Sequence, residues 1–86
     1  GSDDEDGTDL HGLLGFEETG YHQVEIQDMV HRTLDMLPDL ERKVIERRYY
    51  RNQTQRQVAD ALGVSQMTVS RSERRAIERM RTLMQQ

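Results

Sequence analysis

The stretch that decides the fold is residues 54–71, TQRQVADALGVSQMTVSR. Thr54 is followed three residues later by Gln57, the spacing at which two side chains cap a helix N-terminus reciprocally. Gly63 can take the left-handed conformation that ends a helix, and Ser65 can cap the helix that follows. The stretch therefore predicts two helices joined by a tight turn.

The small and apolar residues of this stretch are spaced as in a helix-turn-helix. Ala59 is small where the two helices would touch, and Gly63 comes four positions later, where the turn needs a positive φ. Val69, six residues after Gly63, then lies on the inner side of the second helix. Three more residues complete the small core of the motif: Val58, Leu62 and Val64. With its caps, this spacing predicts a DNA-binding motif.

Two more helices are predicted upstream of the motif. Apolar residues at helical spacing between residues 24 and 37 indicate the first, which Pro38 ends because a proline disfavours the α conformation of the preceding residue. Pro38 suits the first turn of the second helix. The apolar side of that helix comprises Leu40, Val44, Ile45 and Tyr49. The sequence thus predicts an all-α domain over residues 24–86, with four helices and a C-terminal helix-turn-helix.

Residues 1–23 differ in composition from the rest of the chain. They are acidic and rich in glycine, with five Asp or Glu among the first nine residues. Such a segment buries too little apolar surface to offset the entropy lost on ordering. We therefore predict a flexible acidic linker over residues 1–23, from which Leu13, Leu14 and Phe16 could still dock. The initial Gly-Ser is typical of a cloning scar, so we expect a piece of a longer protein.

The net charge of −4 conceals a strong asymmetry between the two halves of the chain. Residues 1–40 carry eleven Asp or Glu and one Arg, a net charge of −10. Residues 41–86 carry five Asp or Glu and eleven Arg or Lys, a net charge of +6. A basic half joined to an acidic half is typical of a nucleic-acid-binding domain with an acidic appendage.

Composition also argues against several functional classes. The chain has no cysteine, and its three histidines lack ligand partners at a useful spacing, so no metal and no other cofactor is expected. No set of nucleophile, acid and base can be assembled, so we do not expect an enzyme. No apolar run approaches the roughly 18 residues of a membrane span. The sequence predicts a cytoplasmic protein that does not bind membranes and is monomeric when free.

The second helix of the motif would enter the major groove of DNA with its first residues facing base edges. Glutamine can bond adenine and arginine can bond guanine, whereas methionine offers an apolar contact. The predicted base-reading residues are Gln66, Met67, Ser70 and Arg71. Free N–H groups at the start of the preceding helix, and arginines further along the second helix, would bind phosphates. The predicted phosphate-binding residues are Thr54, Gln55, Arg56, Thr68, Arg74, Arg75 and Arg79.

The remaining methionines and tyrosines are interpreted as structural residues. Tyr49 and Tyr50 are expected to give one ring in the core and one partly exposed ring. Met67 is expected to be exposed by the geometry of the turn. The other methionines interpreted as core filler are Met29, Met36, Met80 and Met84.

Short motifs along residues 13–81 match the pattern of a known family. They are Leu37-Pro38, Glu41-Arg42, Val44-Ile45, Arg48-Tyr49, Thr54-Gln55, Val58-Ala59, residues 62–67 and Val69-Ser70-Arg71. In these motifs the chain resembles region four of bacterial RNA polymerase sigma factors of the sigma-70 family. The string SQMTVSR at residues 65–71, with Leu14-Gly15 and Gly20-Tyr21 upstream, is most similar to alternative factors of stress response and sporulation.

The resemblance implies promoter recognition in transcription initiation. The fourth helix would recognise the −35 element, and the first helices would form an apolar cleft for the flap tip of the β subunit of core RNA polymerase. Anti-sigma factors commonly bind this domain, so one is an expected partner beside promoter DNA and core polymerase. The acidic segment would be the linker from region three. The residues implied at the polymerase or anti-sigma contact are Met29, Val30, Leu34, Leu37, Val44, Arg47 and Arg48.

Three positions depart from this family's pattern. Arg47, Gln53 and Ser72 stand where apolar residues are usual. A buried polar group without a partner costs about 1–3 kcal/mol. We therefore expect these side chains to be exposed or to meet dedicated partners.

Two alternative functions remain open at this point. The output domain of a response regulator has a similar layout, although its recognition helix usually carries Thr-Val-Lys-x-His where this chain has TVSR at residues 68–71. The second alternative is a protein-interaction module of the same fold, bound by an anti-sigma factor.

Overall fold

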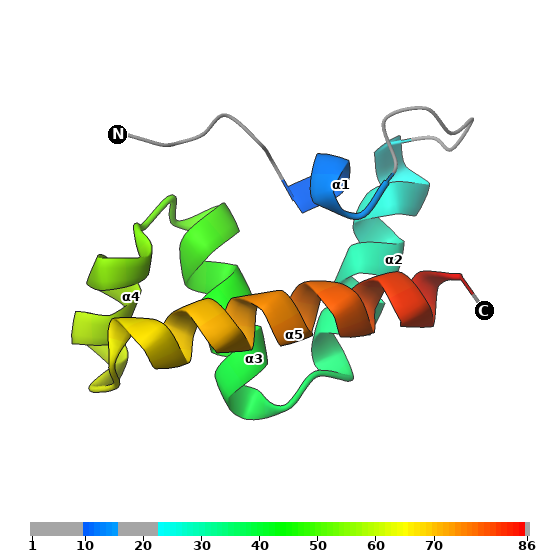
Figure 1. Cartoon of the computed structure of the whole chain (residues 1–86). Helices are drawn as coiled ribbons and strands as arrows, with labels where there is room; N and C mark the ends of the chain where they lie inside the picture. The colour runs from blue at the N-terminus through cyan, green and yellow to red at the C-terminus, as the bar shows by residue number, and fades with distance from the viewer. Residues whose placement is uncertain (1–9, 16–22, 86) are drawn as a thin grey trace.

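The structure is a computed structural model that describes residues 10–15 and 23–85. Its helices, in chain order, are α1 (Leu10–Leu13), α2 (Gln23–Asp35), α3 (Asp39–Ile45), the π-helical turn η1 (Glu46–Tyr50), α4 (Gln55–Leu62) and α5 (Gln66–Met84). The long helix α5 runs the length of the domain, with α4 at its N-terminal end and α1 and α2 towards its C-terminal end (Figure 1). These residues contain no strand, and the predicted all-α fold is confirmed.

The junction between α2 and α3 follows from the single proline. After Asp35, the N–H groups of Met36 and Leu37 donate to the carbonyls of residues 33 and 34, at 3.0 and 3.1 Å, which closes the last turn. Pro38 is the N-cap of α3, with φ −55° and ψ 152°, so it precedes the first turn in which we predicted it. The helix that follows is continuous with η1.

The π-helical turn η1 was not predicted. The N–H of Arg51 donates to the carbonyl of Glu46 at 3.2 Å, five residues back, which is the π-helical register. Asn52 then takes a left-handed φ of 56°, a conformation that asparagine tolerates better than most residues. This residue turns the chain towards α4.

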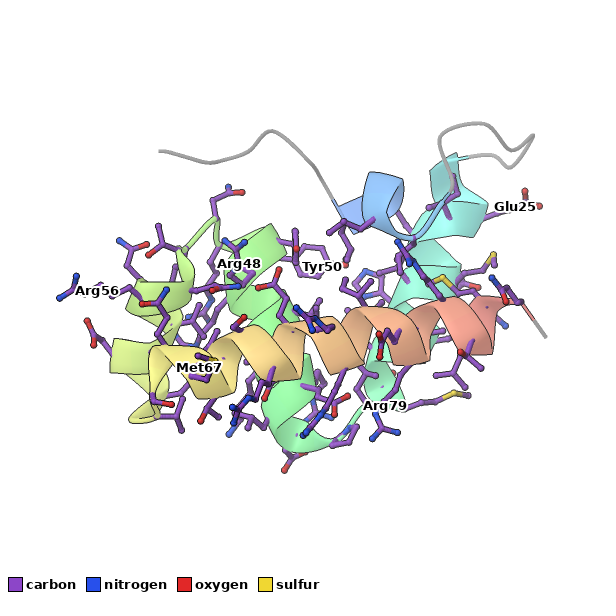
Figure 2. The ribbon with its side chains drawn as sticks, viewed as in Figure 1. Glu25, Arg48, Tyr50, Arg56, Met67 and Arg79 are labelled. Carbon is purple, nitrogen blue, oxygen red and sulfur yellow. The ribbon has the colours of Figure 1, made fainter. Side chains whose placement is uncertain are left out.

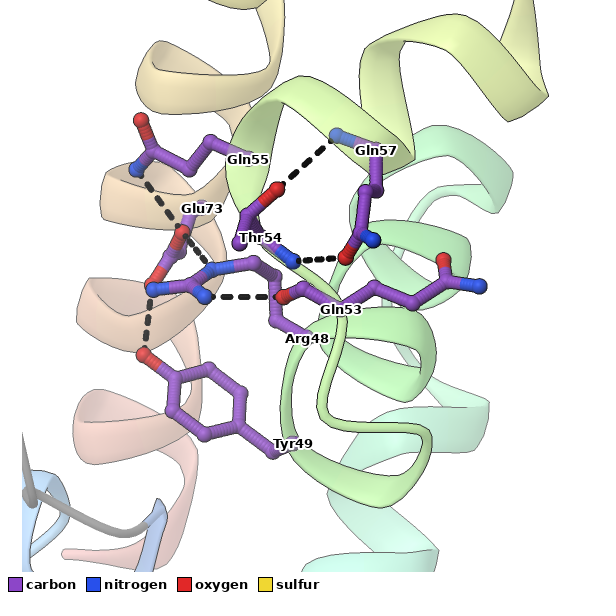
Figure 3. Close-up of polar contacts among 7 residues, drawn as sticks. All are labelled: Arg48, Tyr49, Gln53, Thr54, Gln55, Gln57 and Glu73. Carbon is purple, nitrogen blue, oxygen red and sulfur yellow. Dashed lines mark hydrogen bonds and ion pairs between the residues drawn. The ribbon is translucent and has the colours of Figure 1, made fainter. Parts of the chain in front are cut away.

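The three caps predicted for the helix-turn-helix are confirmed. The Thr54 hydroxyl accepts from the Gln57 N–H at 3.1 Å, and the Gln57 side-chain oxygen accepts from the Thr54 N–H at 2.8 Å (Figure 3). Gly63 ends α4 with φ 71°. The Ser65 hydroxyl accepts from the Thr68 N–H at 3.0 Å and begins α5.

The buried apolar residues form two clusters that meet at α3. Val44 lies in one cluster and the adjacent Ile45 in the other. The small core, inside the helix-turn-helix, comprises Val44, Val58, Ala59 and Val69. The large core comprises Leu10, Leu14, Ile26, Val30, Leu34, Leu37, Ile45, Ala76, Ile77 and Met80.

Residues 10–15 differ from the flexible linker predicted over residues 1–23. Leu10 and Leu14 are only 5 % and 9 % exposed and belong to the large core. Their spacing, with Leu13 between them, puts three leucines on one turn of helix, a local pattern hidden by the acidic average of the segment. Residues 1–9 and 16–22, including Phe16, lie outside the described residues. Within those described, no helix combines the length and apolarity needed to cross a membrane.

Candidate nucleic-acid interface

The predicted base-reading residues occupy the first two turns of α5. Gln66, Met67 and Arg71 are exposed, and Ser70 is half-buried. Met67 is 59 % exposed, as expected for an apolar side chain that the turn directs to solvent, and it projects from the N-terminal end of α5 (Figure 2). The inward side of the same turns carries Val69, which is fully buried. The four predicted residues therefore share the start of one capped helix.

The residues that we predicted to bind phosphate around α4 differ from one another in how far they are exposed and bonded. Arg56 is exposed and points away from the domain (Figure 2). The Thr54 hydroxyl is engaged in its cap, and the Thr68 hydroxyl lies 2.9 Å from the Ser65 hydroxyl. Gln55 donates its side-chain N–H to a carboxylate of α5, so its amide is directed inward. Arg56 is thus the member of this group that presents its charge to solvent.

The arginines further along α5 also differ from one another. Arg74 and Arg75 are exposed. Arg79 Nε lies 2.9 Å from Glu41 Oε1, and the Glu41 side chain is 9 % exposed whereas that of Arg79 is 56 % exposed. Part of the positive charge of Arg79 is therefore neutralised by a shielded carboxylate of α3, which weakens the case for a phosphate contact there.

A buried carboxylate organises the interface. Glu73 accepts from Arg48 Nε at 2.9 Å, from the Gln55 amide at 3.0 Å and from the Tyr49 hydroxyl (Figure 3). A second N–H of Arg48 donates to the Gln53 carbonyl at 2.9 Å. Glu73 thereby joins α5 to η1 and to the first residue of α4. We call these four side chains, Arg48, Tyr49, Gln55 and Glu73, the Glu73 network.

The Glu73 network shifts the ionisation of its members. Burial alone would raise the pKa of Glu73, but hydrogen bonds from Arg48, Tyr49 and Gln55, with the charge of Arg48, outweigh it and lower the pKa. Burial and the hydrogen bond to Glu73 raise the pKa of Tyr49 well above its ordinary value. Glu73 is therefore held as a carboxylate and Tyr49 as a neutral donor.

The role of Glu73 was not predicted, although the sequence contains a signal for it. Glu73 lies four residues after Val69 and three before Ala76, on the buried stripe of α5. A charged residue on such a stripe indicates a buried pair, because an isolated buried charge is very costly. The partner, Arg48, lies 25 residues away in the chain and could not be identified from this pattern.

Most of the apolar residues implied at the polymerase contact are inside the domain. Val30, Leu34 and Leu37 belong to the large core and Val44 to the small core. In this structure these four side chains are buried, so they do not line an open cleft, and their contact with a partner stays a prediction. The other three implied residues are half-buried: Met29, Arg47 and Arg48.

An open groove does exist beside them, between α2 and the C-terminal part of α5. We call it the methionine groove and define it by Met29, Met36, Leu83 and Met84. Met36 is 66 % exposed, so its interpretation as core filler was wrong. The groove continues into a cleft of about 600 Å³. That cleft is lined by Met36, Arg75, Glu78, Arg79, Thr82 and Leu83.

The three polar residues that depart from the family pattern, Arg47, Gln53 and Ser72, are all at least partly buried. Ser72 is buried on the inner side of α5, next to Glu73, so of the two expected outcomes exposure does not hold for it. Gln53 and Arg47 are half-buried, and the Gln53 side-chain oxygen has no hydrogen-bond partner in the described part of the chain. Among the three, Gln53 is the one whose side-chain oxygen is neither exposed nor bonded to a partner in the described residues, contrary to expectation.

The tyrosines are arranged as predicted. Tyr49 packs against the large core, and Tyr50 is half-exposed and stacks on His31 with ring centroids 6.2 Å apart. Across residues 10–15 and 23–85, no group of three or more potential metal ligands occurs. The contact that the structure shows for His31 is its stacking on Tyr50.

Comparison with known proteins points to one family. The family described as "Sigma-70, region 4" matches residues 33–82. The RNA polymerase sigma-B factor of Bacillus subtilis (strain 168) is 39% identical over 69 residues, covering 80% of this chain and 26% of that protein. The RNA polymerase sigma-F factor of Kitasatospora aureofaciens is 41% identical over 81 residues, covering 91% and 27%.

A third relative is also similar over most of this chain and a small part of its own length. RNA polymerase sigma factor SigF of Mycobacterium tuberculosis (strain ATCC 25618 / H37Rv) is 35% identical over 81 residues, covering 94% of this chain and 31% of that protein. The chain therefore spans about a quarter to a third of the length of these relatives. No solved structure matches it.

Proposed function

Because this chain belongs to the sigma-70 family, as its region 4, we propose that it recognises the −35 element of promoters in transcription initiation by bacterial RNA polymerase. The resemblance inferred from the sequence, to sigma factors of the stress and sporulation type, is confirmed by these relatives. The observation that carries the proposal is the exposed set Gln66, Met67 and Arg71 at the capped start of α5. No described feature favours a response-regulator output domain.

The geometry suits insertion of α5 into the major groove. The side chains of Gln66 and Arg71 are free to reach base edges, and each good bidentate contact is worth about 1–3 kcal/mol of discrimination. Arg56 on α4 and Arg74 on α5 present charge on the surrounding surface, where phosphates would lie on either side of the groove. The Glu73 network supports this arrangement because it fixes the start of α4 against α5.

Core polymerase would dock at the other end of the domain, on the methionine groove. Met36 and Leu83 supply open apolar surface there, and flexible methionines suit a surface that adapts to a partner. Arg32, Arg75 and Arg79 lie around it, which favours a partner with acidic residues at its rim. An anti-sigma factor that covered the same groove would compete with polymerase.

Promoter binding by the reconstituted holoenzyme tests the proposal. Gln66→Ala and Arg71→Ala in the parent sigma factor should each reduce affinity for a promoter with an intact −35 element, and should change affinity little when that element is scrambled. Gln27→Ala is the matched control, because Gln27 is an exposed glutamine on α2. Equal losses on both promoters, or a loss with Gln27→Ala alone, would contradict the proposal.

A further inference from the structure

The five methionines of the chain differ in their exposure to solvent. Met80 is completely buried in the large core, and Met29 and Met84 are half-buried against it. Met36 and Met67 are 66 % and 59 % exposed. Because an oxidant must reach the thioether sulfur, Met36 and Met67 are the two methionines that it attacks first.

The two exposed methionines belong to different surfaces. Met36 lines the methionine groove with Leu83, near the C-terminal end of α5. Met67 is the second residue of α5 and projects from its N-terminal end, beside Gln66 (Figure 2). Met67 is therefore the exposed methionine that stands among the residues proposed to read bases, and Met36 is a matched exposed methionine away from them.

Hydrogen peroxide can oxidise Met67 in one balanced step. The sulfur lone pair attacks one oxygen of the peroxide, so that the S–O bond forms as the O–O bond breaks. Sulfur loses two electrons, and the departing hydroxide takes up the remaining proton and leaves as water. The product, methionine sulfoxide, replaces an apolar thioether by a strongly polar group. Met67 belongs to neither core, so this change leaves the packing of the domain intact.

The sulfoxide would change two of the base-reading residues at once. The Met67 thioether suits an apolar contact such as a thymine methyl group, whereas the polar sulfoxide does not. Arg71 lies four residues later on the same face of α5, and its side chain is exposed. Within residues 10–15 and 23–85 the Arg71 guanidinium has no ion pair, so it can donate to the sulfoxide oxygen. A guanidinium held by that oxygen is drawn away from a base edge.

We propose that Met67 is an oxidation switch for promoter selectivity: a peroxide converts it to the sulfoxide, and α5 then distinguishes the −35 element less well from other sequences. This inference rests on the proposed recognition of that element by α5. General attraction to DNA stays, because the charges of Arg56 and Arg74 are unchanged. The switch is reversible, since methionine sulfoxide reductases remove the oxygen as water while a dithiol is oxidised to a disulfide.

Promoter binding before and after peroxide treatment tests the switch. The parent sigma factor is treated with hydrogen peroxide, freed of it, and assembled with untreated core polymerase. The measured quantity is the affinity for an intact −35 element divided by that for a scrambled one, compared with the same protein untreated. Treatment should lower this ratio about fivefold in the parent and in Met36→Leu, and leave it unchanged in Met67→Leu. Weaker assembly through oxidation at the methionine groove affects both promoters equally, so the ratio excludes it.

A second variant keeps the test decisive if Met67→Leu itself reads DNA poorly. Met67→Gln carries a polar group in place of the thioether, so its ratio should be lowered about fivefold without any oxidant. Peptide mass mapping should find sulfoxide at Met36 and Met67 before Met80, and reductase treatment should restore the ratio of the oxidised parent. An unchanged ratio in the treated parent, an equal loss in treated Met67→Leu, or a normal ratio in Met67→Gln would overturn the inference.

The switch and the promoter proposal fail separately. Gln66→Ala and Arg71→Ala test the promoter proposal in protein that has met no peroxide. If they lower the ratio and oxidation of Met67 does not, the switch alone is wrong. If neither substitution lowers the ratio, the promoter proposal itself is wrong.

Discussion

Arg48 and Glu73 join two parts of the domain that are 25 residues apart, with Arg48 Nε 2.9 Å from Glu73 Oε1. The Arg48 side chain is 26 % exposed and that of Glu73 is 12 % exposed, so Glu73 is the more shielded of the two from water. The pair is bonded further, Arg48 to the Gln53 carbonyl and Glu73 to Tyr49 and Gln55. It therefore links the π-helical turn, the start of α4 and the middle of α5 through one carboxylate.

Replacing this carboxylate should destabilise the domain. Glu73→Gln leaves the Arg48 charge without its counter-ion and weakens the bonds from Tyr49 and Gln55, so we expect a loss of about 1–3 kcal/mol in the free energy of unfolding. Urea denaturation followed by circular dichroism measures the loss. Glu78→Gln, an exposed carboxylate on the same helix, is the control and should be nearly neutral. Equal midpoints for the two variants would contradict this prediction.

The same group should make stability depend on pH in the acid range. The pKa of Glu73 is lowered from its ordinary 4.5 in the folded state, so its carboxylate stabilises the fold fully above that ordinary value. The contribution is lost as the pH falls below 4.5 and through the folded-state pKa. We expect the stability gap between the parent chain and Glu73→Gln to be constant near neutrality and to shrink as the pH falls below 4.5. A gap that stays constant in denaturation at each pH would show that Glu73 does not carry this dependence.

Replacing the turn glycine should strain the backbone without any steric clash. Gly63 has φ 71°, and a Cβ built there meets nothing within 4 Å. Gly63→Val should cost about 1–3 kcal/mol because a β-branched residue is strained at positive φ. Gly63→Asn, which tolerates this conformation, should cost clearly less. Equal melting temperatures for Gly63→Val and Gly63→Asn would show that the loss of stability does not come from backbone strain.

DNA contacts along α5 should divide between specificity and general attraction. Arg71→Ala should cost about 1–3 kcal/mol on an intact −35 element and little on a scrambled one, because it removes base readout. Arg79→Ala should weaken both DNAs equally and modestly, since Glu41 already neutralises part of its charge. Holoenzyme binding on the two DNAs at several salt concentrations measures both effects. A change of sequence preference with Arg79→Ala would mean that α5 enters the groove further than its first turns.

The parts of the fold that depend on near neighbours could be predicted from the sequence. The caps at Thr54 and Ser65 each involve a residue three positions away, and the turn at Gly63 depends on its own backbone freedom. The exposed position of Met67 follows from those caps, because they fix where α5 starts. These rules placed the caps and the turn of the helix-turn-helix correctly.

The parts that depend on distant residues could not be predicted. No local preference distinguishes residues 46–50 from an ordinary α-helix, and the residues of η1 are held by contacts with Glu73 on α5. The docking of Leu10 depends on a groove that exists once α2 and α5 have packed. Whether Val30 packs within the chain or against another protein could not be predicted, because an apolar stripe does not reveal which of the two it contacts.

The length of α5 has a mechanical consequence for promoter recognition. Its 19 residues span about 28 Å and carry the proposed base-reading side chains at one end and the methionine groove at the other. Tilting such a helix by about 7° about its C-terminal end displaces its N-terminal end by about 3.4 Å, which is the rise of one base pair. If polymerase docks on Leu83 and Met84 as proposed, the accuracy of that docking would therefore set the accuracy with which Gln66 is placed against the proposed base.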